Sequence, residues 1–293
     1  MPELPEVETI VRGLQTVLPG RRVVELRAGK VNMMEDPEKL GDSIPGSQLV
    51  AVRRHGKFLQ LELQPLAKEA RRLHLLIHLG MTGQLTVTAA NEAIPPHTHA
   101  FFTLDDGREL RFRDARRFGR MLLAPESMKT QVLGKLGADP LEVTAEEFRR
   151  QLEHRRARIK ALLLDQSVFR GMGNIYTDES LWRSKIHPAR LAANLKREEI
   201  ARLYAAMRHI LEAAIRLGGS SISDYIGADG RSGEFQMRHR VYQREGEKCV
   251  RCRGRIARMI VAGRSSYYCP QCQRAPRSRK KARGRSEAKS RAD

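Results

Sequence analysis

The chain has 293 residues, a length that suggests about two domains with ample hydrophobic cores. Hydrophobic residues make up 41% of it, yet no apolar run approaches the roughly 20 residues of a membrane-spanning helix. No secretory signal opens the sequence either, so we expect a cytoplasmic protein without a membrane partner. Lysine and arginine number 54 against 34 acidic residues, a net charge of +20. Residues 274–293 carry +7 of this charge, so the rest of the chain is also basic. The excess of positive charge favours nucleic acid as the binding partner; the alternatives are an anionic lipid surface or a merely basic protein.

The first six residues contain an amine and two carboxylates suited to covalent chemistry. After removal of the initiator methionine, Pro2 would present a secondary α-amine, a type of group whose pKa is roughly 8. Such amines form Schiff bases, and Glu3 and Glu6 are near enough in sequence to move protons for that reaction. The structural alternative is that Pro5 begins a helix with acids at its positive end. Apolar residues at helical spacing predict this helix as far as Pro19-Gly20: Val7, Ile10, Val11, Leu14 and Leu18.

Residues 22–124 alternate between apolar and polar side chains with a period of two, which predicts β-strands. The turn sequence Asp105-Asp106-Gly107 separates two of these runs and indicates a hairpin. Several short strands punctuated by turns are typical of an antiparallel sandwich or barrel. The clearest alternating faces are Leu59, Leu61 and Leu63, followed by Leu73, Leu75, Ile77 and Leu79.

Polar and basic residues cluster where these predicted strands end. Lys57 follows a basic run at 53–55, and His97 opens a later strand. Met81 lies in a glycine-flanked turn, and Phe118 follows a run of arginines. Single apolar side chains usually belong to a core, but these settings allow the alternative of exposed tips that wedge between DNA bases.

The second half is predicted to be mainly helical, after a linker at 137–140. A capping box at Thr144–Glu147 begins a helix that we expect to reach about Leu164 and to present a solvated basic face. The glycine-rich segment 170–176 leads into another helix, and either cradles a phosphate or simply links helices. A further amphipathic helix ends at Gly218-Gly219, followed by a polar, glycine-containing loop that is either a lid or a connection. The basic residues of the first of these helices are Arg149, Arg150, Arg155, Arg156, Arg158 and Lys160.

All four cysteines lie in two CxxC pairs with 16 residues between the pairs: Cys249, Cys252, Cys269 and Cys272. This spacing predicts a four-thiolate structural zinc site, with no coordination position left for water. The alternative of two redox motifs lacks a thioredoxin-like βαβ context. The intervening segment reads as a β-hairpin with Arg264 at its tip, and the basic low-complexity sequence after Gln273 predicts disorder.

Together these motifs resemble one family, the bacterial formamidopyrimidine-DNA glycosylases, over roughly residues 2–272. The resemblance rests on the opening PELPEVE sequence and on the order of the motifs that follow it. Leu4, where the sibling endonuclease VIII group usually has glycine, favours the oxidised-purine branch. The other motifs are His78–Gly83, Asp114–Gly119, Gly173–Tyr176 and the four-cysteine hairpin.

The resemblance implies a multidomain α+β fold and a single structural Zn²⁺. An antiparallel β-sandwich with flanking helices would span 2–136, and a helix-two-turn-helix domain with a lesion-capping loop would span 141–235. The zinc hairpin would span 239–273, and 274–293 would be a disordered basic tail. The implied protein is a monomer that binds damaged duplex DNA in the cleft between its halves. It would excise 8-oxoguanine and formamidopyrimidines, then cleave the strand by β,δ-elimination.

The family's site residues carry over by motif. Pro2 would attack the sugar, Glu3 would move protons, and Lys57 and Arg264 would assist the eliminations and hold phosphate. The other DNA contacts would be His97, Arg116, Arg155 and Asn174. Met81, Arg116 and Phe118 would fill the gap left by the flipped nucleotide. The chain departs from the family at Ala115, where a proline is common, which is expected to loosen the turn that carries Phe118.

Two other functions remain open at this level. The sibling enzyme would prefer oxidised pyrimidines. A non-catalytic zinc protein that recognises DNA shape would bind duplex without cleaving it.

Overall fold

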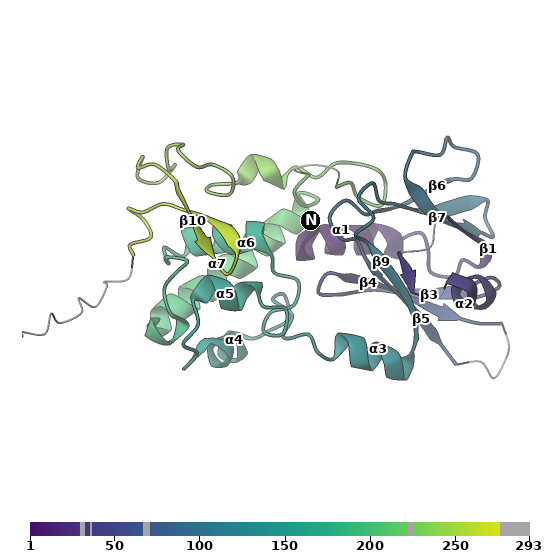
Figure 1. Cartoon of the computed structure of the whole chain (residues 1–293), viewed down its shortest axis with the longest axis horizontal. Helices are drawn as coiled ribbons and strands as arrows, with labels where there is room; N and C mark the ends of the chain where they lie inside the picture. The colour runs from purple at the N-terminus through teal and green to yellow at the C-terminus, as the bar shows by residue number, and fades with distance from the viewer. Residues whose placement is uncertain (30–32, 36, 67–70, 222–224, 276–293) are drawn as a thin grey trace, which may run out of the picture.

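A computed structural model of the chain describes residues 1–29, 33–35, 37–66, 71–221 and 225–275. A β-rich half comes first along the chain, and a half made of helices and a short hairpin follows it (Figure 1). Each half has its own buried apolar cluster. The expectation of a disordered tail concerns 274–293, of which 276–293 lie outside the described residues.

Two sheets form the first half, which confirms the predicted sandwich. One sheet has the strand order β2-β9-β5-β4-β3 and the other has the order β1-β7-β8-β6. All neighbours are antiparallel except the short β2, which runs parallel to β9. The strands are β1 (Val23–Ala28), β2 (Met34–Glu35), β3 (Gln48–His55), β4 (Phe58–Gln64), β5 (Leu73–His78), β6 (Gln84–Ala89), β7 (Thr98–Leu104), β8 (Arg108–Arg113) and β9 (Arg120–Pro125).

The alternation seen in the sequence places leucine side chains in the core between the sheets. Leu59, Leu61 and Leu63 of β4 are all buried there. The predicted turn at 105–107 joins β7 to β8, with Gly107 in the left-handed region at φ 82°. Two short helices in this half were not predicted: α2 (Pro37–Ser43) and α3 (Glu126–Leu133).

The helical half contains α4 (Ala145–Leu152), α5 (Ile159–Leu164), α6 (Asn174–Arg183) and α7 (Arg197–Arg216), with short 3₁₀ turns at Ala192–Asn194 and Phe235–Arg238. The prediction of one helix from Thr144 to Leu164 was wrong. The chain breaks at 153–158, where backbone groups pair with residues 190–193 instead of continuing the helical ladder. The expected solvated basic face was wrong for Lys160, which is fully buried.

The hairpin at the end of the described chain consists of β10 (Ala257–Val261) and β11 (Arg264–Tyr268), as predicted. None of the helices in the described part of the chain is both long and apolar enough to cross a bilayer.

Helix α1 (Leu4–Gln15) joins the two halves. Leu4 belongs to the apolar cluster of the helical half, whereas Val7 and Ile10 belong to that of the sandwich. Beside it, the guanidinium of Arg54 pairs with Glu8 of α1 (2.7 Å) and with Asp139 of the linker (2.7 Å). The start of the chain is therefore fixed at the joint between the halves rather than left free, because its helix packs into both cores.

Candidate active site

The carboxylate of Glu3 lies against the amino-terminal end of α6, in this joint. Its Oε1 accepts a hydrogen bond from the backbone N–H of Ile175 (3.0 Å), and its Oε2 accepts one from Tyr176 (3.4 Å). The N–H groups that the glycine-rich turn presents at these two residues therefore bind a carboxylate of the chain itself. Burial raises the pKa of Glu3 to about 7, with Lys57 opposing the rise and Glu6 adding to it. A carboxyl group with this pKa both donates and accepts protons near neutrality.

Two glycines allow the start of the chain to approach α6 this closely. Gly171 has φ 95°, and a Cβ added to it would lie 2.9 Å from the Cβ of Leu4. A Cβ at Gly173 would lie only 2.2 Å from the Cδ of Glu3. The backbone N–H of Leu4 also donates to the carbonyl of Gly171 (3.0 Å). The glycine-rich turn therefore leaves the space into which Glu3 and Leu4 pack.

Pro2, the predicted nucleophile, is buried next to Glu3 in the chain. In the sequence it follows Met1, which is 49% exposed. The peptide bond to Met1 makes the nitrogen of Pro2 an amide, so removal of Met1 is the condition for its nucleophilicity.

Lys57 reaches the site from the turn between β3 and β4. Gly56, just before it, has φ 61° and packs on the loop before α6, with an added Cβ 3.0 Å from the Cβ of Arg170. Burial lowers the pKa of Lys57, while Glu3 and Glu6 raise it and Arg264 lowers it further. Lys57 therefore lies close enough to Glu3 and to Arg264 for both charges to act on it.

Glu6 is the centre of a buried hydrogen-bond network that the sequence suggested only in part. Its side chain accepts hydrogen bonds from the backbone N–H of Glu3 (2.8 Å), from the hydroxyl of Tyr176 and from the backbone N–H of Ser220 (2.7 Å). The Oγ of Ser220 in turn lies 3.1 Å from Nε2 of His239. Burial raises the pKa of Glu6, although these hydrogen bonds oppose the rise. The network ties the start of the chain to the predicted capping loop, of which residues 222–224 lie outside the described residues.

Arg264 is exposed at the start of β11, and a set of buried contacts fixes the next residue. The carbonyl of Ser265 accepts hydrogen bonds from Nζ of Lys160 (2.8 Å) and from Nδ2 of Asn174 (2.9 Å). Lys160 also pairs with Asp178 of α6 (2.7 Å), and both side chains are fully buried. Asp178 accepts a second hydrogen bond from the backbone N–H of Tyr267 (2.9 Å). Asn174 therefore lies beside the hairpin that carries Arg264.

Sequence reasoning missed the roles of Lys160 and Asp178. A lysine in an arginine-rich segment gives no sign of burial. Asp178, four residues after the first residue of α6, likewise gives no sign in the sequence that it is buried. The one available signal was the position of Lys160 directly before the apolar run at 161–164.

Met81 and Phe118 are exposed, as the wedge hypothesis requires: 38% and 49% respectively. Their turns touch, because a Cβ added to Gly80 (φ 62°) would lie 2.5 Å from the backbone carbon of Phe118. The guanidinium of Arg116 covers the Phe118 ring at 4.9 Å from its centroid. The three predicted wedge residues therefore form one exposed tip.

Asp114 organises this tip from below. It is fully buried, and its carboxylate accepts hydrogen bonds from the hydroxyl of Thr82 and from the backbone N–H groups of Arg116 (3.2 Å) and Gly119 (2.7 Å). These bonds fix the turn that contains Ala115 in place of proline. The loosening that this substitution suggested is therefore opposed by three hydrogen bonds.

His97 and Arg155, the remaining predicted DNA contacts, lie apart from the catalytic candidates. His97 is exposed, with φ 69°, and its carbonyl accepts from the backbone N–H of Asp114 (3.0 Å), so it borders the tip. Arg155 is exposed in the break between α4 and α5, where it forms hydrogen bonds with Gln151, Leu152 and Ala193. No contact within the described residues connects Arg155 to Glu3 or Lys57.

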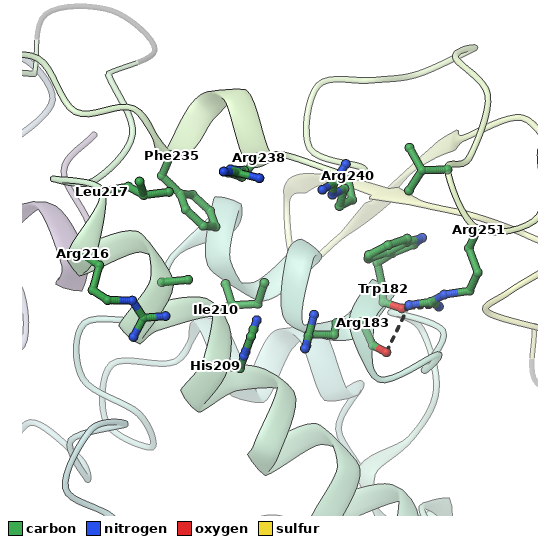
Figure 2. Close-up of a pocket in the computed structure, with 12 residues that line it drawn as sticks. Trp182, Arg183, His209, Ile210, Arg216, Leu217, Phe235, Arg238, Arg240 and Arg251 are labelled. Carbon is green, nitrogen blue, oxygen red and sulfur yellow. Dashed lines mark hydrogen bonds between the residues drawn. The ribbon is translucent and has the colours of Figure 1, made fainter.

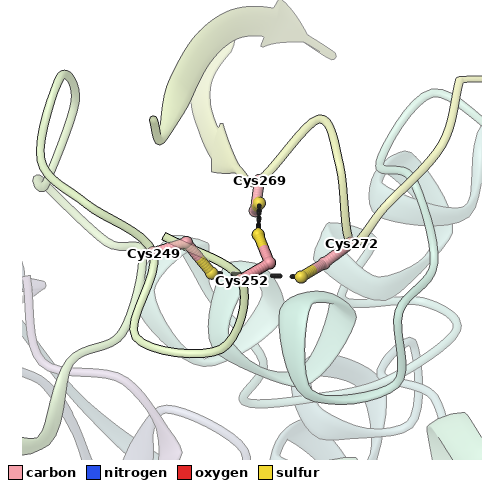
Figure 3. Close-up of side chains that lie close together, drawn as sticks. All are labelled: Cys249, Cys252, Cys269 and Cys272. Carbon is pink, nitrogen blue, oxygen red and sulfur yellow. Dashed lines mark hydrogen bonds between the residues drawn. The ribbon is translucent and has the colours of Figure 1, made fainter. Parts of the chain in front are cut away.

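The four cysteine sulfurs converge at the base of the hairpin (Figure 3). Each lies within 4.8 Å of the others, with 3.9 Å between Cys249 and Cys272 and 3.4 Å between Cys252 and Cys269. Tetrahedral zinc with Zn–S bonds of about 2.3 Å needs sulfurs about 3.8 Å apart. The donor set fits one Zn²⁺, which would hold the hairpin together and leave no open coordination position.

Comparison with known proteins covers the same three parts. Residues 1–121 match the family model of the formamidopyrimidine-DNA glycosylase N-terminal domain, and 136–225 match that of its H2TH domain. Residues 246–275 match the zinc finger found in FPG and IleRS.

Curated relatives and solved structures agree with these matches. The formamidopyrimidine-DNA glycosylase of Solibacter usitatus is 44% identical over 276 residues, 94% of this chain and all of the relative; that of Pelotomaculum thermopropionicum is 43% identical, over 94% and 99%. A Lactococcus lactis FPG mutant in complex with Fapy-dG-containing DNA superposes with a TM-score of 0.85 at 33% identity, over 94% of this chain and all of that one. The wild-type Lactococcus lactis enzyme with DNA containing an oxidised pyrimidine gives 0.83 at 32%, with the same coverage.

Proposed function

The chain belongs to the formamidopyrimidine-DNA glycosylase family of base-excision repair enzymes, and we propose that Pro2, once Met1 is removed, is the nucleophile with which it excises oxidised purines from duplex DNA. It is a glycosylase with lyase activity, it binds damaged double-stranded DNA, and it has one structural zinc ion. The observation that carries the proposal is the buried position of Glu3 at the amino-terminal end of α6. A buried acid with a pKa of about 7 lies immediately after the amine and beside Lys57.

In the proposed reaction, the lone pair of the Pro2 nitrogen forms a bond to C1′ of the damaged nucleotide. The glycosidic bond breaks, the base leaves with the bonding electron pair, and it takes up the proton that the Pro2 nitrogen loses. Protonated Glu3 donates a proton to the ring oxygen as the sugar opens, which leaves an iminium between Pro2 and C1′. The hydrogen bonds from Ile175 and Tyr176 favour the carboxylate that remains after this transfer.

The iminium acidifies the C2′ position, so loss of a C2′ proton expels the 3′ phosphate, and a second elimination expels the 5′ phosphate. Lys57, whose pKa is lowered by burial, is suited to take up a proton in the first elimination and to hold phosphate. Arg264, at the tip of the zinc hairpin, is the candidate for the second elimination and another phosphate contact. Asn174 is the candidate phosphate ligand from α6.

Base removal from a duplex requires that the damaged nucleotide be flipped out of the stack, at a cost of a few kcal/mol. The exposed tip made by Met81, Arg116 and Phe118 is suited to fill the gap, and it is apolar and cationic at once. His97 borders this tip and is proposed as a DNA contact there. Arg155, in the break between α4 and α5, is proposed as a more distant phosphate contact.

Three functional parts follow from this proposal. Residues 2–136 supply the catalytic residues at the N-terminus, 141–235 the DNA-binding helices and capping loop, and 239–273 the zinc hairpin. We propose that the protein acts as a monomer in the bacterial cytoplasm, on nucleoid DNA. The basic residues of 274–293 are proposed to add to DNA affinity.

Borohydride reduction tests the proposal directly, since it converts an iminium to a stable amine. With an 8-oxoguanine duplex, the chain without Met1 is expected to form a covalent protein–DNA adduct through Pro2, which peptide mapping locates. A matched protein with one extra residue before Pro2 keeps the amide nitrogen and should bind DNA without an adduct. Absence of an adduct from the trimmed chain would refute the proposal.

A lesion panel decides the second candidate substrate class. The solved relative with an oxidised pyrimidine in its DNA makes that class a specific competitor. Faster excision of thymine glycol or dihydrouracil than of 8-oxoguanine would assign this chain to oxidised pyrimidines instead. Binding without excision of any lesion would favour a non-catalytic damage-recognition protein.

A further inference from the structure

A pocket of about 770 Å³ lies on the helical half, between α6, α7, the 3₁₀ turn at Phe235–Arg238 and the part of the zinc hairpin that contains Val250 and Arg251 (Figure 2). It shares none of its lining residues with the site that contains Glu3, Lys57 and Arg264. Its volume is in the range of sites that enclose a small ligand or an anchoring side chain. The side chains in its apolar wall are Trp182, Ile210, Ala213, Leu217, Phe235 and Val250.

The rim of this pocket is strongly cationic. Five arginines line it: Arg183, Arg216, Arg238, Arg240 and Arg251. Within the described residues, no carboxylate forms an ion pair with any of these five. Other arginines of the helical half pair with acidic residues that are close to them in the sequence. Arg183 and Arg216 lie on either side of His209, whose pKa they lower in addition to the effect of burial. The guanidinium of Arg251 donates to the carbonyls of Trp182 (3.0 Å) and Arg183 (3.4 Å), whereas the other four have no carboxylate partner among the described residues. Guanidiniums of this kind around one apolar pocket constitute a site for an anion with an apolar part.

We propose that this pocket binds an acidic peptide segment of another protein, with an apolar side chain inside it and carboxylates on the arginine rim. Arginine forms bidentate hydrogen bonds with carboxylates, and the apolar wall supplies the anchoring contact. The site goes beyond the repair reaction itself and offers a way to bring the enzyme to a partner.

Other occupants fit the pocket less well. A DNA duplex, whose major groove alone is about 12 Å wide, is too large to enter a pocket of this volume. A nucleobase needs an open aromatic face, but Trp182 and Phe235 are 7% and 2% exposed. The Arg251 guanidinium covers the Trp182 ring at 4.1 Å. The chain's own segment 274–293 carries +7 and would be repelled by the rim.

Trp182 makes the test direct, because it is the only tryptophan in the chain and lines the pocket. The full-length zinc-loaded protein is titrated with a short peptide of aspartates ending in two leucines, while tryptophan emission is followed. We expect a saturable change in emission, and none with the matched peptide in which asparagines replace the aspartates.

The variant Arg183→Gln/Arg216→Gln is expected to bind the acidic peptide roughly tenfold more weakly, as two exposed charge pairs are lost. Both side chains are exposed, so the fold and the excision rate should not change. Arg150→Gln/Arg197→Gln, with the same loss of charge on exposed helix positions outside the pocket, is the matched control and should bind normally.

Three results would overturn the proposal. The first is no saturable change with the acidic peptide. The second is equal weakening by the control variant, which would indicate nonspecific attraction. The third is a saturable change with a single-stranded oligonucleotide, lost in Arg183→Gln/Arg216→Gln, which would make the pocket an extension of the nucleic-acid path.

Discussion

Glu3 rests directly on the α-carbon of Gly173, so that a methyl group on that carbon would lie 2.2 Å from the carboxyl carbon of Glu3. The contact joins the third residue of the chain to the residue before α6. It places a carboxylate on the N–H groups that begin the helix, where negative charge is favoured. The proposed acid is thus positioned by the absence of a side chain 170 residues away.

Gly173→Ala is therefore expected to displace Glu3 and to slow base excision by about a hundredfold, since small displacements of a catalytic group carry such costs. Single-turnover excision of 8-oxoguanine measures the effect. Gly41→Ala is the control, because a Cβ at Gly41 meets nothing within 4 Å. An unchanged rate in Gly173→Ala would mean that the position of Glu3 does not matter for the reaction.

The pH dependence of excision should report the protonation of Glu3. Because its pKa is raised to about 7, the protonated acid predominates below that pH and is lost above it. If the protonated form donates to the sugar, the single-turnover rate falls about tenfold per pH unit on the alkaline side. Glu3→Gln should be slower by roughly 10²–10⁴ and should lose this alkaline limb. An identical limb in the variant would assign the titration to another group.

The buried pair Lys160–Asp178 should stabilise the docking of the zinc hairpin. Lys160→Met leaves Asp178 buried without its partner, and we expect a loss of about 3 kcal/mol in the free energy of unfolding. Amide exchange at Ser265–Tyr267 should accelerate, because the hydrogen bonds to this strand are weakened. The double variant Lys160→Met/Asp178→Leu should recover much of the stability, since neither charge remains buried. A double variant as unstable as the single one would contradict this account.

Cys252→Ser is expected to lose zinc and, with it, the hairpin that presents Arg264. DNA affinity should fall, while the sandwich stays folded because its apolar core is separate from that of the zinc hairpin. Metal analysis measures the zinc content, and circular dichroism shows whether the sandwich stays folded. Full retention of zinc by the variant would contradict the four-ligand site.

The exposed tip predicts a difference between two substrates. Met81→Ala and Phe118→Ala should slow excision from a duplex, in which the damaged base must be flipped. They should have little effect on cleavage of a single-stranded abasic site, where no stack has to be filled. Val24→Ala, another exposed apolar position (56% exposed), is the control. Equal losses on both substrates would point to misfolding rather than a wedge.

The sequence alone was sufficient for features set by local chemistry or by spacing. The alternation of leucines in β4 and β5 predicted buried strands, because a period of two places every second side chain on one face. The cysteine spacing predicted the zinc site, because four thiolates at these intervals can surround one ion. The opening motif identified Pro2 and Glu3 as candidates. It did not explain how they are held.

The tertiary structure decided which distant residues meet. The helix predicted from Thr144 to Leu164 is broken because backbone pairing with 190–193 competes with the helical ladder, and no local pattern reports that competition. The burial of Lys160 follows from a partner 18 residues away and a carbonyl 105 residues away. The raised pKa of Glu3 likewise comes from desolvation by α6 and its loop. Periodicity and spacing describe neighbours along the chain, whereas burial and charge at this site arise from segments that only folding brings together.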